Sequence, residues 1–329
     1  MRCAAPEVRS SLPASSVVAQ LCATAWPGPR IQRFRAIEEG WAHLLLEGDG
    51  RWMFRVPRRS ELARRLGREV ALLDYLGHRI RARVPEPILV GTLPRPRGWP
   101  FFVYARLPGV PLRDPRALPP GERRRLAAYL VALFEDLGAC PPGPLARIGV
   151  PRLDRDATVL RFRRLRRRYR ARAARHVPHE LDRAIEASFA DLIRVLGVSR
   201  FRPRLVHGDL WPSHLLWDRR RGAPRGVLDW EDASLGDGAA DLVAFESVAT
   251  ELGAELARRR TLAPDRHFDE RLACYRDVVP VHGLVFGWEQ GNLRRATAHR
   301  RELEARLLGR GRLTPCPEDP AGRAAARSR

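Results

Sequence analysis

The sequence of 329 residues contains no lysine, so all 60 of its basic side chains are arginines. A net charge of +22 is compatible with a nucleic-acid or acidic-membrane partner. Arginine, alanine, proline and glycine are all abundant, which indicates a coding bias that raises arginine over the whole surface. The arginine-rich stretch 161–170 has apolar residues three to four positions apart, typical of an amphipathic helix with a solvated basic face. An anion-binding patch stays open there, but the chain has no zinc-finger, basic-zipper or RNA-binding signature, so we expect no specific nucleic-acid partner.

Cysteines and long apolar runs are also scarce. The five cysteines are scattered without paired spacing, which excludes a zinc site or disulfide framework and favours a reduced, cytoplasmic protein. No run of 18 uncharged apolar residues occurs, so we expect neither a transmembrane helix nor a membrane partner. The N-terminus, with Glu7 and Pro13, makes a poor secretion signal.

The first hundred residues have the pattern of a small sheet with helices. Gly48-Asp49-Gly50 lies between two apolar runs and predicts a hairpin. Helices are expected near 17–25 and over 62–76, where apolar residues recur at helical spacing. The predicted strands are 33–37, 42–47, 52–56, 88–90 and 101–104.

The rest of the chain is mainly helical in pattern, apart from strands and loops at 204–230. We expect a small lobe over 1–104, a hinge at 105–110, a helical lobe over 111–311 and a disordered tail over 312–329. The predicted helices are 122–137, 156–175, 179–196, 239–259, 268–279 and 281–308.

Three residues in the 204–230 stretch have the spacing of a phosphoryl-transfer site. In kinases the catalytic-loop Asp is followed five residues later by an Mg²⁺ ligand, and an Asp on a later turn also holds Mg²⁺. Here Asp209 is followed by His214, and Asp229 comes twenty residues after Asp209. Apolar pairs beside each acid indicate short buried strands that hold the loops. The spacing predicts Asp209 as catalytic base, and His214 and Asp229 as metal ligands.

In order and spacing, this block resembles the signature of the aminoglycoside phosphotransferase family, which belongs to the protein-kinase-like superfamily. The resemblance covers roughly residues 15–310 and implies an α+β, two-lobed protein-kinase-like fold. His207 is expected to brace the loop, and Asp237 and Asp241 to fix the segment after it. The matching residues are His207-Gly208-Asp209, His214, Leu228-Asp229-Trp230-Glu231, Gly236-Asp237 and Ala240-Asp241-Leu242.

The N-terminal half carries the nucleotide-binding part of the resemblance. Gly40 occupies the place of the nucleotide loop, and Val103 and Ala105 that of the hinge strand. Arg55 looks like the phosphate-binding cation of the third strand, with Glu69 as its helix partner. There are three departures: Arg55 replaces the usual lysine, the loop is poor in glycine, and His214 replaces the commoner asparagine, as in branches resembling macrolide and 2''-aminoglycoside kinases.

The resemblance implies an enzyme, a kinase that moves the γ-phosphate of ATP or GTP to a hydroxyl of an antibiotic or related metabolite, with Mg²⁺ as cofactor. A basic chain favours macrolides, peptide antibiotics, sugars or amino alcohols over polycations. The departures leave a nucleotide-binding pseudokinase or regulatory module as the alternative. We expect a monomer whose partners are nucleotide and small-molecule substrate. The candidate acceptor contacts, each more often a surface charge, are Glu231, Asp232, Glu246 and Glu289.

Overall fold

A computed structural model describes residues 14–23, 31–37, 42–95, 97–259 and 265–309. The chain forms two compact units. The first runs to Gly109 and also includes Arg225–Glu231, and the second comprises Val110–Pro224 and the described residues from Asp232 onward. The expectations for Gly40 and for the tail over 312–329 lie outside the described residues.

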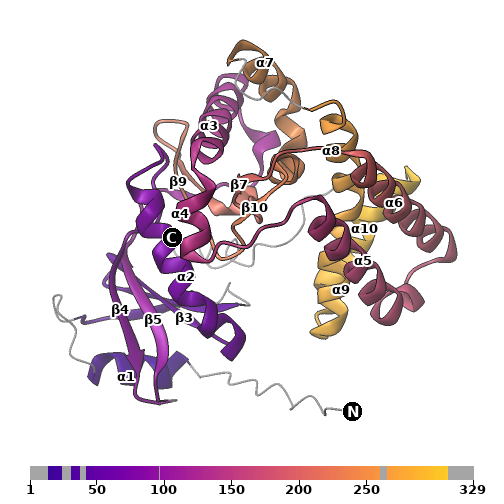
Figure 1. The fold of residues 1–329 in the computed structure, drawn as a ribbon. Coiled ribbons are helices and arrows are strands. Elements are labelled where there is room, and N and C mark those ends of the chain that lie inside the picture. The colour runs from indigo at the N-terminus through magenta and orange to yellow at the C-terminus, as the bar shows by residue number, and fades with distance from the viewer. Residues whose placement is uncertain (1–13, 24–30, 38–41, 96, 260–264, 310–329) are drawn as a thin grey trace. The chain divides into compact units, whose positions relative to one another are not determined.

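The first unit contains a five-stranded antiparallel sheet in the order β1-β2-β3-β5-β4 (Figure 1). All five predicted strands are present. The predicted hairpin joins β2 to β3 through a turn in which Asp49 and Gly50 both have positive φ, 50° and 69°. The strands are β1 (Phe34–Ile37), β2 (His43–Gly48), β3 (Trp52–Pro57), β4 (Pro87–Leu93) and β5 (Trp99–Ala105).

Two helices cover opposite faces of this sheet. Helix α1 (Ala14–Ala23) packs its Val17 and Leu21 into a core that contains Phe54 and Val103. Successive strand residues point to opposite faces, so Arg55 points away from this core. Helix α2 (Ser60–Gly77) lies on that other face, because its Glu69 is an ion-pair partner of Arg55.

The second unit is mainly helical, with one apolar core shared by α5, α6, α8, α9 and α10. Figure 1 shows α5, α6, α9 and α10 grouped together. Its α-helices are α3 (Pro120–Ala139), α4 (Pro142–Ile148), α5 (Arg155–Arg172), α6 (His179–Val198), α7 (Ala249–Arg259), α8 (Phe268–Val278), α9 (Pro280–Glu289) and α10 (Leu293–Leu308). Its 3₁₀ helices are η1 (Pro115–Ala117), η2 (Ala174–His176), η3 (Pro212–His214) and η4 (Gly238–Val248).

Short strands frame the loops that carry the candidate acids. Strand β10 pairs with β7, and β6 pairs with β8, both antiparallel. Strand β9 runs across the boundary between the two units. The bounds are β6 (Val110–Pro111), β7 (Arg204–Val206), β8 (Leu215–Asp218), β9 (Ala223–Val227) and β10 (Ser234–Gly236).

Two predicted helices were each wrong in length. The segment 239–259 divides into η4 and α7, and Phe245 near the end of η4 has non-helical angles (φ −111°, ψ 27°). The segment 281–308 divides into α9 and α10, because Gly291 adopts φ +67° and the Asn292 side chain accepts a hydrogen bond from the next helix's Arg295 N–H. Neither α4 nor β10 was predicted.

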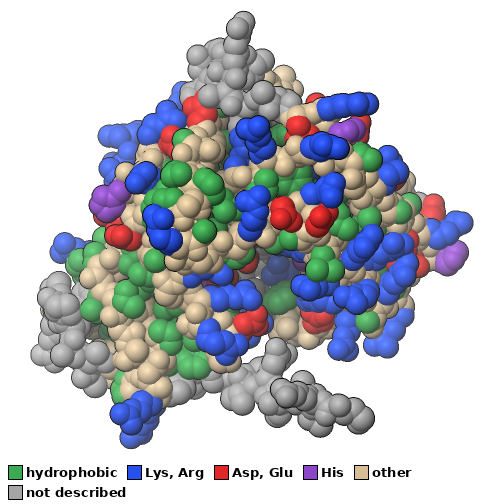
Figure 2. Space-filling view, in the orientation of Figure 1, with side chains coloured by type: hydrophobic (Ala, Val, Ile, Leu, Met, Phe, Trp, Pro, Cys, Tyr) green, Lys and Arg blue, Asp and Glu red, His purple; other side chains and the backbone are tan. Residues whose placement is uncertain are grey.

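The arginine-rich stretch forms part of α5, with Phe162, Leu165 and Tyr169 buried, which confirms the amphipathic helix. Two of its arginines, Arg166 and Arg170, pair with Glu186 of α6. Figure 2 shows basic side chains over much of the visible face, with acidic ones among them. Within the described residues no helix is both long and apolar enough to span a membrane.

Candidate active site

A buried arginine lies at the centre of the candidate site in the first unit. Arg55 of β3 is 6% exposed, and its Nη2 donates to Asp229 Oδ1 at 2.6 Å. Its Nε lies 3.3 Å from Glu69 Oε1, without the alignment of a hydrogen bond, and Nη2 lies 3.6 Å from Glu231 Oε2. The structure thus brings Arg55 and Glu69 together, as the sequence predicts, and adds Asp229 and Glu231.

Burial and neighbouring charge act on Arg55 in opposite directions. Burial opposes the charge of Arg55, but the neighbouring carboxylates, with Asp229 first, outweigh it and raise the pKa of the guanidinium well above its ordinary value. Arg55 therefore stays charged.

Asp229 follows β9 in a conformation that few residues adopt. Its φ is +65°, in the left-handed region, which asparagine and aspartate tolerate better than most other residues. The next residue, Trp230, is 1% exposed and its Nε1 donates to the Val227 carbonyl at 3.1 Å. The buried indole fixes this turn, so that the Asp229 carboxylate, 30% exposed, has a defined direction.

The loop between β7 and η3 presents Asp209 to solvent. The Asp209 side chain is 41% exposed, and its Oδ1 accepts a hydrogen bond from Trp211 Nε1 at 2.8 Å. The preceding Gly208 has φ +83°, where a side chain would be strained. Buried His207 accepts a hydrogen bond from the Asp209 backbone N–H through Nδ1, at 3.3 Å. This supports the bracing role expected of His207.

His214 is tied to the same loop through one ring nitrogen. Its Nδ1 lies 2.7 Å from the Asp209 carbonyl oxygen. A carbonyl only accepts hydrogen bonds, so Nδ1 carries the proton and a neutral ring has its lone pair on Nε2. That tautomer is the one a metal-binding imidazole needs.

Asp241 holds the backbone of the Asp209 loop from inside the second unit. Its two carboxylate oxygens accept hydrogen bonds from the backbone N–H groups of His207, at 2.7 Å, and Gly208, at 2.9 Å. Burial raises the pKa of Asp241 to about 6, although both N–H donors favour the carboxylate. Asp241 is thus bonded to the backbone of the Asp209 loop itself, which precedes the segment it was expected to fix.

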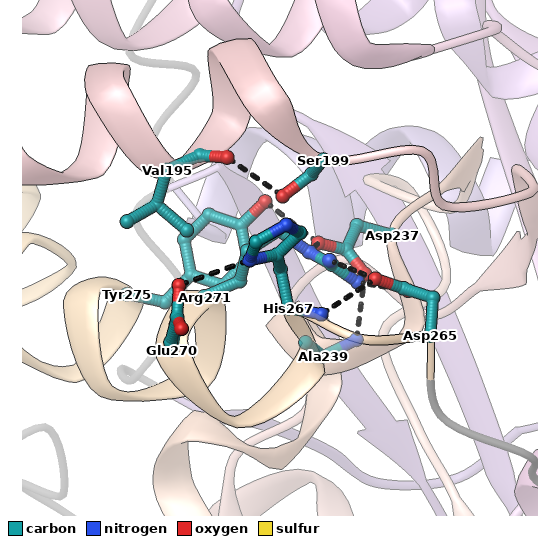
Figure 3. Close-up of polar contacts among 9 residues, drawn as sticks. All are labelled: Val195, Ser199, Asp237, Ala239, Asp265, His267, Glu270, Arg271 and Tyr275. Carbon is teal, nitrogen blue, oxygen red and sulfur yellow. Dashed lines mark hydrogen bonds and ion pairs between the residues drawn. The ribbon is translucent and has the colours of Figure 1, made fainter.

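A buried ion network supports Asp241 in turn (Figure 3). Arg271 of α8 is fully buried, with Nε 2.6 Å from Asp237 Oδ2 and Nη1 2.7 Å from Asp265 Oδ1. Asp237 also accepts from the Tyr275 hydroxyl at 3.0 Å and from the Ala239 N–H at 3.1 Å. Asp237 thereby caps η4, which carries Asp241. Sequence reasoning missed Arg271; the available signal was an arginine on the apolar face of α8, in line with Phe268, Tyr275 and Val278.

The predicted nucleotide contacts on β5 differ from each other. Val103 is fully buried in the sheet core with Phe54, and at this position β5 is paired with β3 on one side and β4 on the other. Ala105, at the end of β5, is exposed. The carboxylates considered as acceptor contacts are also partly engaged: Glu246 pairs with Arg306, Glu289 with Arg168 and Glu231 with the Arg55 cluster.

Known proteins share this architecture. The chain is 26% identical to viomycin phosphotransferase of Streptomyces vinaceus over 263 residues, which is 78% of this chain and 88% of that protein. Among solved structures, the GDP and kanamycin complex of APH(2'')-IIia superposes with a TM-score of 0.79 and 22% identity, covering 90% of this chain and 99% of that one. A macrolide 2'-phosphotransferase type I gives a TM-score of 0.68 and 20% identity, covering 89% and 98%.

These likenesses confirm the two-lobed, protein-kinase-like fold class that the sequence predicts. The sequence pattern of the phosphotransferase enzyme family matches residues 33–275, most of the chain, including every described candidate residue except Glu289. This protein is therefore an enzyme that transfers phosphoryl groups to small molecules, and it belongs to the phosphotransferase enzyme family.

Proposed function

We propose that this enzyme transfers the γ-phosphate of ATP or GTP to a hydroxyl group of an antibiotic or a related small molecule. The loop that presents Asp209 carries the proposal. Its backbone is fixed from inside by Asp241, and the Asp209 carboxylate remains 41% exposed. A fixed but accessible carboxylate suits a general base.

In this proposal Asp209 accepts, or orients, the proton of the acceptor hydroxyl as the phosphoryl group moves. Arg55 contacts the donor phosphates, which suits a guanidinium that stays charged while buried. Glu69 keeps Arg55 in position from α2. Gly40 and Ala105 are the proposed nucleotide contacts, along with the backbone of Val103.

Asp229 and His214 would hold Mg²⁺. The donor set fits a divalent cation: a carboxylate that is 30% exposed, and an imidazole whose Nε2 carries the lone pair. The nitrogen ligand suits Mg²⁺ less well than an oxygen and would bind Mn²⁺ more readily. When bound, the cation neutralises negative charge on the donor phosphates.

The donor and acceptor classes rest on relatives. Solved structures of similar fold are complexes with GDP, ADP and ATP, so we propose a purine nucleotide donor. The viomycin phosphotransferase match makes viomycin the first acceptor to test. Aminoglycosides and macrolides follow, because the similar structures include kinases of both classes. We also propose that the protein acts as a cytoplasmic monomer.

One observation favours the alternative, a nucleotide-binding protein without turnover. Arg55 donates to Asp229 at 2.6 Å, so the proposed phosphate ligand and the proposed metal ligand engage each other. An enzyme must separate them when nucleotide and metal bind. A pseudokinase could keep this pair intact.

The test compares the full-length protein with Asp209→Asn. We would measure nucleotide consumption with Mg²⁺ and each acceptor, and binding of fluorescent ADP and GDP analogues. General-base loss should lower turnover by roughly 10²–10⁴-fold while leaving nucleotide affinity unchanged. Asp74→Asn, on the exposed face of α2, is the matched control and should retain full turnover. Full turnover in Asp209→Asn would reject the proposed base, and nucleotide binding without turnover by any acceptor would favour the pseudokinase.

A further inference from the structure

A histidine at the start of β2 lies beside the Arg55 cluster. His43 is 3% exposed, and its Nδ1 lies 3.4 Å from Glu231 Oε2. These residues are 188 positions apart in the chain, yet both belong to the first unit. A buried polar ring against a carboxylate calls for an explanation, because burial of polar groups is costly unless they have partners.

The His43 ring is neutral in this place. Burial and the nearby Arg55 charge hold its pKa well below the ordinary value. A neutral imidazole can offer one N–H to a carboxylate without adding charge. The 3.4 Å contact does not have the geometry of a hydrogen bond, so His43 restrains the direction of the Glu231 carboxylate by contact and by its dipole.

Glu231 is tied to three elements of the first unit. His43 of β2 contacts its carboxylate, Arg55 of β3 lies 3.6 Å from the same Oε2 atom, and Arg68 of α2 donates to its backbone carbonyl at 3.1 Å. The backbone is thus anchored, and the carboxylate stands between His43 and Arg55. A small rotation would decide which of the two it meets.

Two carboxylates lie close enough to compete for Arg55 Nη2. It lies 2.6 Å from Asp229 and 3.6 Å from Glu231. Coulomb energy rises as distance falls, and burial strengthens it, so a Glu231 carboxylate that moved onto Arg55 would bind it firmly. The guanidinium would then have less capacity for a phosphate.

We propose that His43 is a positioning residue of the phosphoryl-transfer site, which holds the Glu231 carboxylate away from Arg55 and so keeps that guanidinium available for nucleotide phosphates. This inference rests on the proposed phosphate contact of Arg55. It does not depend on the acceptor. Its prediction is a loss of nucleotide affinity, with little change in acceptor KM.

A second arrangement of the same residues would be a metal site, since donor atoms of His43, Glu69 and Glu231 all lie within 4.8 Å of one another. Arg55 argues against it. Its guanidinium already lies 3.3 Å and 3.6 Å from the two glutamates, where its charge repels a cation.

The test uses His43→Asn and His43→Leu in the full-length protein. Asparagine places an N–H donor near the position of Nδ1, whereas leucine fills the space without a donor. We expect His43→Leu to weaken binding of a fluorescent ADP or GDP analogue by about tenfold and His43→Asn to bind like the wild type. Equal loss in both variants, or no loss in either, would overturn the proposal.

A double-mutant cycle separates positioning from a simple packing defect. Glu231→Gln removes the competing charge, so adding His43→Leu to it should cost far less affinity than in the wild type. Additive losses would contradict the proposal. If His43→Leu does not fold, the comparison uses His43→Asn and His43→Gln instead. Glutamine moves the N–H donor to the position of Nε2, so only the His43→Gln variant should bind nucleotide weakly.

The binding assay also separates this inference from the proposed function. Nucleotide binding that follows the His43 pattern in a protein without turnover would support the positioning role and reject the kinase activity. Metal analysis after dialysis against Zn²⁺ or Mn²⁺ tests the other arrangement. One bound equivalent in the wild type that His43→Asn loses would replace the positioning role by a metal site.

Discussion

The two groups of candidate residues, one in each unit, hold their acids by different means. In the Arg55 cluster of the first unit, Arg55 forms ion pairs with Glu69 and Asp229. In the second unit, the backbone N–H groups of His207 and Gly208, in the Asp209 loop, donate hydrogen bonds to the carboxylate of Asp241, which lies more than 30 positions later in the chain. One region is fixed by ion pairs and the other by backbone hydrogen bonds.

This difference fits the roles proposed for the two groups. A guanidinium proposed to bind phosphate can be buried because neighbouring carboxylates keep it charged. A proposed base must remain accessible to its substrate. Fixing the backbone around Asp209 leaves its carboxylate exposed, and the Trp211 indole is its neutral neighbour.

Removal of the central charge should produce the largest effect. Arg55→Gln leaves Glu69, which is 5% exposed, without its counter-charge. Loss of one partner of a buried pair costs about 3–5 kcal/mol, so we expect a fall of that size in the free energy of unfolding in urea. The control is Arg35→Gln on β1, whose partner is Glu47 but whose side chain is 71% exposed; it should cost less than about 1 kcal/mol. Similar losses in both variants would show that burial does not set the strength of the Arg55 cluster.

A glycine substitution tests the other region. In Gly208→Ala the new Cβ would lie 2.3 Å from the Asp232 carbonyl oxygen, and φ of +83° is strained for alanine. We expect a loss of about 1–3 kcal/mol in the free energy of unfolding and a larger relative loss of turnover, because the loop must move. Gly149→Ala is the matched control, since φ is +86° there but no atom lies within 4 Å of the new Cβ. If Gly208→Ala kept its turnover, rigid backbone support of Asp209 would be disproved.

Local patterns carried most of what the sequence could predict. The spacing of Asp209, His214 and Asp229 lies within a short strand-and-loop stretch, and the five strands of the first unit have clear apolar runs. The resemblance of Arg55 and Glu69 to the paired cation and glutamate of kinases could be recognised because each residue lies on a regular element, a strand and a helix.

Contacts between distant segments could not be predicted. His43 meets Glu231 only because β2 and the turn after β9 come together in the fold. Arg271 reaches Asp237 from another element, and nothing in the local sequence names that partner. The breaks at Phe245 and Gly291 were missed because both lie inside segments with continuous helical composition, where single-residue angles end the helix.

The smallest effect is expected at His214, the proposed metal ligand in the second unit. In His214→Asn the amide can still donate to the Asp209 carbonyl, which His214 Nδ1 now contacts at 2.7 Å, and its oxygen is a better ligand for Mg²⁺. We expect stability to be unchanged and turnover with Mg²⁺ to stay within about tenfold of the wild type, with a lower Mn²⁺ to Mg²⁺ activity ratio, because an imidazole favours Mn²⁺. His214→Leu removes both the donor and the ligand, and should lose activity with either cation. Equal loss in the asparagine and leucine variants would mean that the imidazole does more than hold a metal and the loop.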